Sequence, residues 1–155
     1  MARKKVRVAI IGVGNCASSL VQGVHYYRNA KDTDTVPGLM HVNLAGYHIK
    51  DIEFTLGIDI SAVKVGKDLS EAIFAHPNNT YKFTDVPKMN VPVVRGMTHD
   101  GLGKYLAEVI EKAPGPTDDI VGLLKETKTD VVLNFLPVGS EMATKWYVEQ
   151  TIEAG

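Results

Sequence analysis

The amino-acid sequence predicts an α/β protein built on a doubly wound parallel sheet. Short runs rich in Val and Ile alternate along the 155 residues with segments whose apolar side chains recur at helical spacing. A helix between two strands returns the chain to the same edge of the sheet, so successive strands run parallel. Because these crossovers are almost always right-handed, four strands are expected in the order 3-2-1-4.

Four apolar runs predict the strands. The first is a continuous Val- and Ile-rich segment, which is typical of a strand buried on both faces. In the third, Pro92 stands near the beginning, where a missing N–H donor is tolerated. The predicted strands cover residues 6–14, 53–60, 91–95 and 130–136.

Helical periodicity follows the strands. After the first one, Ala17, Val21 and Val24 fall on one helical face. Asn15 and Ser18 are placed to satisfy free amide groups at the start of that helix. The predicted helices cover residues 15–29, 63–74, 101–112, 117–127 and 140–153.

Two segments do not follow this rhythm. Pro37 and Gly38 interrupt residues 31–50, which indicates an inserted excursion between the first helix and the second strand. Residues 81–89 are expected to be irregular or to form an edge segment. Doubly wound sheets usually have a fifth and a sixth strand, so residues 1–155 are interpreted as one partial domain that is cut off after four strands.

Composition and charge exclude several kinds of function. Seventeen basic and eighteen acidic side chains give a net charge of −1, so nothing in the overall charge favours binding to nucleic acid or to an anionic membrane. No apolar run reaches the ~20 residues of a membrane span. The basic start is not interpreted as a signal peptide, because Arg7 interrupts the apolar run that follows it. The single Cys16 cannot form an internal disulfide, which fits the cytoplasm.

The strongest local signal is a G-x-G-x-x-A motif between the first strand and the first helix. Gly12 permits a tight turn, Gly14 lets a diphosphate approach the backbone, and Ala17 allows close contact between helix and strand. Free amide groups and the positive end of the helix dipole then face the phosphates, which predicts a Rossmann-like dinucleotide site. A glycine turn that only joins two packed elements, or a loop that binds S-adenosylmethionine, is the alternative. The motif consists of Gly12, Val13, Gly14, Asn15, Cys16 and Ala17.

Asp59 ends the second strand, where a carboxylate accepts the ribose hydroxyls of the adenosine half. Its charge repels a 2′-phosphate, which favours NAD over NADP, although Lys64 lies close to it in sequence. Asp59 follows the glycine motif by more than the usual ~20 residues, and the excursion over 31–50 accounts for most of the difference. A strand-end turn former is the alternative role.

The loop after the fourth strand is the other candidate contact. Ligands of open α/β sheets bind at the carboxyl ends of the strands, so this loop is expected to pass near the ribose or the nicotinamide. Ser140 is equally placed to be the N-cap of the last helix. The candidate residues of the loop are Pro137, Val138, Gly139 and Ser140.

The other reactive side chains predict no separate site. Cys16 lies at a helix N-terminus, but no histidine is placed by local spacing to activate it, so we interpret it as a small side chain beside the diphosphate. The five histidines are scattered without metal-ligand spacing, and no metal site is predicted.

Four segments are specific enough to indicate a family. They are GVGNCASSLVQGV (12–24), VPGLMH (36–41), KVGKDLSEAIF (64–74) and LPVGSE (136–141). In this order they resemble the amino-terminal part of bacterial and archaeal inositol-3-phosphate synthase, also called myo-inositol-1-phosphate synthase. The likeness extends from about Val6 to the end and includes the excursion.

This resemblance implies that the complete protein converts glucose 6-phosphate to 1D-myo-inositol 3-phosphate with tightly bound NAD, for inositol and phospholipid biosynthesis. The family's route is oxidation at C5, enolisation, aldol cyclisation and reduction by the same NADH, so the net reaction is an isomerisation. The resemblance also implies a cytoplasmic homo-oligomer, commonly a tetramer.

The resemblance further implies NAD contacts at Asp68 and Tyr147. The family's catalytic lysines and its sugar-phosphate pocket belong to later sequence, so no catalytic residue is assigned in this chain and the chain alone is expected to be inactive. His99 stands where relatives tend to carry an apolar residue, which leaves the role of its loop open. A generic NAD-dependent dehydrogenase domain and a non-catalytic NAD-sensing module are the two alternative functions.

Overall fold

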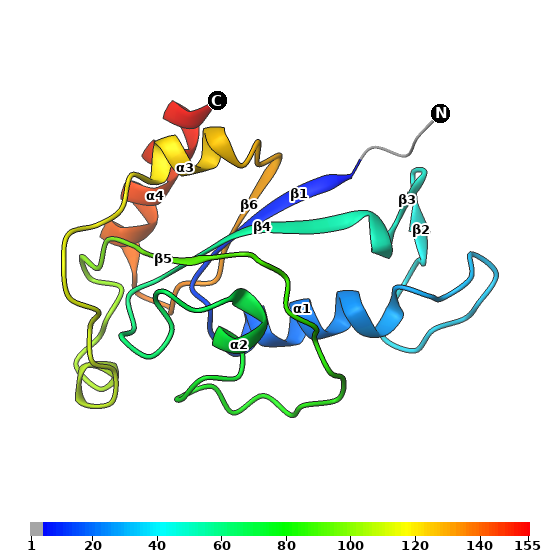
Figure 1. The fold of residues 1–155 in the computed structure, drawn as a ribbon, viewed down its shortest axis with the longest axis horizontal. Coiled ribbons are helices and arrows are strands. Elements are labelled where there is room, and N and C mark those ends of the chain that lie inside the picture. Colours follow the sequence, from blue (N-terminus) through cyan, green and yellow to red (C-terminus); the bar gives the residue numbers. More distant parts are fainter. Residues whose placement is uncertain (1–4) are drawn as a thin grey trace.

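The computed structural model describes residues 5–155 and contains one four-stranded parallel sheet (Figure 1). Its strands are β1 (Val6–Ile11), β4 (Ile52–Asp59), β5 (Val93–Arg95) and β6 (Val131–Asn134). They lie in the order β5-β4-β1-β6, and all three pairings are parallel. In chain order of the sheet's own strands this is 3-2-1-4, so the predicted fold class is confirmed.

The first strand is shorter than predicted because the buried residues continue beyond the hydrogen-bonded ladder. Val13 is fully buried, yet its N–H donates to the side chain of Asp59 and not to a neighbouring strand. The apolar run continues past Ile11, where β1 ends, because Val13 is buried without belonging to the strand.

Helices cover both faces of the sheet (Figure 1). On one face, apolar side chains of α1 (Asn15–Tyr27) and α2 (Leu69–Ala72) pack with those of β1 in one core cluster. On the other face, α3 (Ile120–Glu126) and α4 (Glu141–Ala154) contribute to a second cluster. This two-sided packing defines a doubly wound sheet.

Among the described residues, no helix has the length and apolar character needed to cross a membrane.

Two predicted helices are largely absent. Over 63–74 the only α-helix is α2, because Gly66 adopts a left-handed φ of +84° and Asp68 then caps a new helix start. Over 101–112 the chain forms only the 3₁₀ turn η2 (Leu106–Glu108). The apolar side chains in that segment line a cavity and do not pack against the sheet as a helix face.

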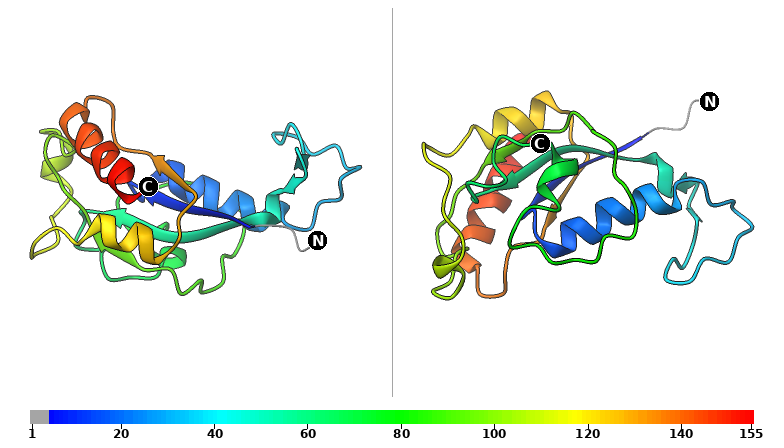
Figure 2. Two further views of the ribbon diagram at one scale, coloured as in Figure 1. Left: turned by 90° about the horizontal axis from the view of Figure 1, so that it is seen from above. Right: turned by 60° about the horizontal axis from the view of Figure 1, so that its bottom comes forward.

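The predicted excursion contains a small hairpin. Strands β2 (Asn43–Leu44) and β3 (Tyr47–His48) pair antiparallel, and the 3₁₀ turn η1 (Ile49–Asp51) leads into β4. Figure 2 shows that the hairpin lies at the opposite end of the molecule from the loop of residues 97–110. Residues 81–89 form no helix or strand, as predicted.

Candidate functional site

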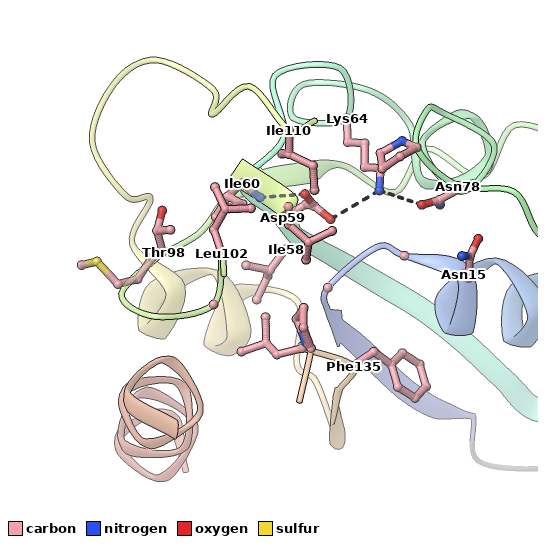
Figure 3. A pocket seen from close by; sticks show the side chains of 18 of the residues that line it. Asn15, Ile58, Asp59, Ile60, Lys64, Asn78, Thr98, Leu102, Ile110 and Phe135 are labelled. Atoms are coloured by element: carbon pink, nitrogen blue, oxygen red, sulfur yellow. Dashed lines mark hydrogen bonds and ion pairs between the residues drawn. The ribbon is translucent and has the colours of Figure 1, made fainter. Parts of the chain in front are cut away.

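A cavity of about 360 Å³ lies at the carboxyl ends of β1, β4 and β6, within the size range of small-molecule sites (Figure 3). Gly12 and Gly14 of the loop after β1, which we call the glycine loop, form part of its wall. The segment around Thr98 and Leu102 forms the opposite part. The cavity is therefore at the edge of the sheet where the sequence predicts a ligand.

The two glycines of the loop meet different requirements. Gly12 has a φ of +85°, and a Cβ there would lie 2.9 Å from the carbonyl oxygen of Phe135. It is needed for the turn itself and for close contact with the segment after β6. Gly14 has no protein atom within 4 Å of the position of a Cβ, so the space beside it is open. Ala17, in the first turn of α1, is fully buried in the core cluster that it shares with β1, in accord with the predicted close contact between helix and strand.

The N-terminus of α1 carries no side-chain cap among the described residues, whereas α2 and α3 are capped by Asp68 and Asp119. The prediction that Asn15 and Ser18 cap α1 is wrong. Asn15 Oδ1 accepts hydrogen bonds from the amides of Asn79 and Thr80, while the buried Ser18 hydroxyl accepts one from Gln22. The positive end of α1 thus lacks an internal acceptor.

Asp59 lies on the cavity wall but is strongly engaged by backbone. Oδ2 accepts the Val13 N–H at 2.8 Å, and Oδ1 accepts the N–H groups of Ile60 and Ser61 at 2.8 and 2.9 Å. The turn-forming role is therefore present. A carboxylate has about four acceptor positions, so about one is left for a ligand.

Lys64 and Asn78 are members of the site that sequence analysis did not assign. Lys64 Nζ donates to the Val13 carbonyl oxygen at 2.8 Å and to Asn78 Oδ1 at 2.9 Å (Figure 3). Burial lowers the pKa of Lys64, and the Asp59 carboxylate opposes that shift. No periodic pattern marks either residue, because they meet the glycine loop only through the fold.

Of the four candidate residues predicted in the loop after β6, one lines the cavity. Pro137 lines the cavity, whereas the side chain of Val138 is fully exposed and Gly139 adopts a left-handed φ of +92°. Ser140 occupies the N-cap position of α4, but its hydroxyl donates to the Pro137 carbonyl at 2.6 Å and makes no cap hydrogen bond. Asp100 supplies that cap instead, through the amides of Met142 and Ala143.

Of the remaining predicted contacts, Tyr147 lines the cavity, whereas Asp68 and Cys16 do not. The Tyr147 hydroxyl donates to the Met97 carbonyl at 2.9 Å, and burial raises its pKa. The Asp68 carboxylate accepts amides of Ser70, Met89 and Val91. Cys16 is exposed.

His99 borders this site without joining it. It adopts a positive φ of 41°, and its ring lies 6.3 Å from that of Trp146. Within residues 5–155, no cluster of three His, Cys, Asp or Glu side chains is arranged to hold a metal ion.

An open parallel sheet with helices on both faces, a glycine turn and a cavity at its carboxyl edge defines a Rossmann-like α/β domain. No family model matches the chain. Individual proteins do: the chain is 58% identical over 154 residues to the inositol-3-phosphate synthase of Mycobacterium tuberculosis H37Rv, covering 99% of this chain and 42% of that protein. It is 50% identical over 155 residues to the synthase of Corynebacterium glutamicum, covering 100% and 43%. The resemblance to inositol-3-phosphate synthases is therefore confirmed, and the chain spans less than half the length of these relatives.

Two solved structures share the fold. A crystal structure of Ari2 superposes with a TM-score of 0.79 at 29% identity, over 97% of this chain and 43% of the other. A myo-inositol-1-phosphate synthase-related protein from Thermotoga maritima gives a TM-score of 0.59 at 25% identity, over 96% and 40%.

Proposed function

We propose that this chain is the NAD-binding part of an inositol-3-phosphate synthase. The observation that carries the proposal is that the uncapped start of α1 and the open space beside Gly14 meet at one cavity. An anion there would supply the acceptor that the first helical turn lacks. The likeness to named synthases supports the wider assignment.

The residues present fit a dinucleotide. Gly14 and the first turn of α1 would hold the diphosphate, Asp59 would accept one ribose hydroxyl, and Pro137 would border the nicotinamide half. NAD, when bound, supplies a hydride acceptor that returns as donor in the same cycle. Apolar side chains of the 97–110 segment would exclude water from the site.

The environment of Lys64 favours NAD over NADP. A 2′-phosphate would lie beside the Asp59 carboxylate, and a free cation would be needed to offset the repulsion. Lys64 already donates to Val13 and Asn78, and its side chain is 4% exposed. The Lys64 ammonium group is therefore not free to pair with a 2′-phosphate at that position.

The whole protein would convert glucose 6-phosphate to 1D-myo-inositol 3-phosphate as a cytoplasmic homo-oligomer, with its catalytic residues outside this chain. We assign no catalytic residue here and expect the 155-residue chain to have no activity by itself.

Ligand binding can be tested by thermal stabilisation with NAD, NADP and S-adenosylmethionine. Ligand at 100 times Kd stabilises a protein by about 2.7 kcal/mol, and we expect that response for NAD. Stabilisation by S-adenosylmethionine alone would contradict the proposal. The complete gene product should form inositol phosphate from glucose 6-phosphate, and oxidation of other substrates without that product would favour a dehydrogenase.

A further inference from the structure

The buried side chain of Lys64 and the partly buried side chain of Asn78 hold one peptide group of the glycine loop. The Val13 carbonyl oxygen accepts hydrogen bonds from Lys64 Nζ at 2.8 Å and from Asn78 Nδ2 at 3.0 Å. Lys64 Nζ also donates to Asn78 Oδ1 (Figure 3). With the two bonds to the Val13 carbonyl, the three groups form a closed triangle. We call Lys64 and Asn78 the loop clamp.

Each side chain of the clamp has a further neighbour outside the glycine loop. Asn78 Nδ2 also donates to the Ile73 carbonyl at 3.0 Å, which ties it to the segment after α2. Lys64 Nζ lies 4.0 Å from Asp59 Oδ2, and its side chain is nearly inaccessible to solvent. Burying an ammonium group is costly unless it is paired and hydrogen-bonded, so a buried lysine at this position calls for a role beyond packing.

Peptide geometry gives that role. In a trans peptide the C=O and N–H groups point in opposite directions, and the described chain has a cis bond only at His76–Pro77. Donors on the Val13 carbonyl therefore turn the N–H of Gly14 to the other side of the peptide plane, away from Lys64. Asp59 holds the preceding peptide in the same way through the Val13 N–H.

We propose that Lys64 and Asn78 are positioning residues that orient the Gly14 amide and the first turn of α1 towards the diphosphate of the bound nucleotide. This inference rests on the proposed function. The clamp would act on the phosphates only through the backbone, because the lysine's hydrogen bonds go to Val13 and Asn78.

The test compares a ligand that has the diphosphate with one that lacks it. Affinities of the ¹⁵N-labelled chain for ADP-ribose and for adenosine are measured by NMR titration, with Gly14 as the reporter amide. Lys64→Met and Asn78→Leu remove the donors at similar side-chain size, and Lys64→Leu, which also lacks a donor, replaces Lys64→Met if the latter does not fold. Lys67→Met is the matched control, because Lys67 is an exposed lysine three positions away.

We expect both clamp variants to lower the affinity for ADP-ribose about tenfold or more, which is the scale of a hydrogen bond to a charged group. The affinity for adenosine should stay within about twofold of that of the unsubstituted chain. The shift of the Gly14 amide on adding ADP-ribose should shrink in both variants and persist in the control. Equal losses for the two ligands would show a general structural role and overturn the inference.

Three other outcomes also test the inference. A loss confined to the Lys64 variant would mean that the ammonium contacts phosphate directly, which overturns the positioning role. Unchanged ADP-ribose affinity in both variants would overturn the inference and leave the proposed function standing. If the unsubstituted chain binds neither NAD nor ADP-ribose, the proposed function fails and this inference fails with it.

Discussion

The carboxylate of Asp100 accepts a hydrogen bond from the backbone amide of Ala143 at 2.8 Å, across 43 positions of the sequence. Its other oxygen accepts the amide of Met142 at 2.9 Å, so Asp100 caps α4 from a different loop. These amides hold the pKa of Asp100 below its usual value. This cap therefore connects the 97–110 segment, which lines the cavity, to α4.

Asp100→Ala should therefore loosen the cavity wall and α4 together. We expect a lower Tm and weaker NAD binding, because the first turn of α4 loses the acceptor for two amides. Circular dichroism melting and NAD titration measure the two effects. Glu141→Ala, an exposed residue at the start of the same helix, serves as the control. Equal effects of both substitutions would contradict this account of the cap.

The two glycines of the glycine loop should respond differently to substitution. Gly12→Ala places a methyl group against the Phe135 carbonyl at a left-handed φ, which should cost about 1–2 kcal/mol in the free energy of unfolding. At Gly14 the position of a Cβ has no protein atom within 4 Å, so Gly14→Val should change Tm less than Gly12→Ala does while abolishing NAD binding. Denaturant unfolding and NAD titration separate these effects. Normal NAD binding by the Gly14 variant would place the cofactor elsewhere.

Gly96 is required by the buried Tyr147. A Cβ at Gly96 would overlap the Tyr147 hydroxyl and lie 2.7 Å from Ile58 Cγ2. Gly96→Ala should destabilise the protein by about 1–3 kcal/mol, the usual cost of overpacking. Adding Tyr147→Phe should restore part of that loss, whereas Gly103→Ala, with open space around it, should have little effect. A Gly96 variant as stable as the Gly103 variant would contradict this packing.

Asp68 should make stability depend on pH in the acid range. Burial raises its pKa, but hydrogen bonds from Ser70, Met89 and Val91 outweigh this, so the pKa lies below the usual 3.8. The carboxylate then stabilises the folded state fully above the unfolded pKa, and this contribution is lost as pH falls below 3.8 through the folded pKa.

Substitution at Asp68 tests that dependence. Asp68→Ala should lower the free energy of unfolding at pH 7 by about 1–2 kcal/mol, as for other lost N-caps, and the difference from the unsubstituted protein should narrow below pH 3.8. Urea unfolding at a series of pH values measures this. The exposed Glu71→Ala on the same helix should show no such narrowing, and a constant gap for Asp68→Ala would refute the assignment.

Local patterns in the sequence were sufficient to predict the sheet and most of its helices. Apolar runs and helical spacing predicted the four strands, their order and the helices that became α1, α3 and α4, because these depend on which side chains a strand or helix must bury. The helix predicted over 101–112 was wrong because Leu102, Leu106 and Ile110 have helical spacing but line the cavity. Periodicity reports that a side chain is apolar and does not distinguish a core from a ligand pocket.

Residues close together along the chain specify the doubly wound sheet, the glycine turn and the likeness to inositol-3-phosphate synthases, so all three could be predicted from local patterns. The side chains that hold the glycine turn could not be predicted in this way. Lys64 reaches Val13 across 51 positions, and Asp100 reaches Ala143 across 43. Hydrogen bonds between such distant residues depend on how the elements pack, and no local spacing encodes them.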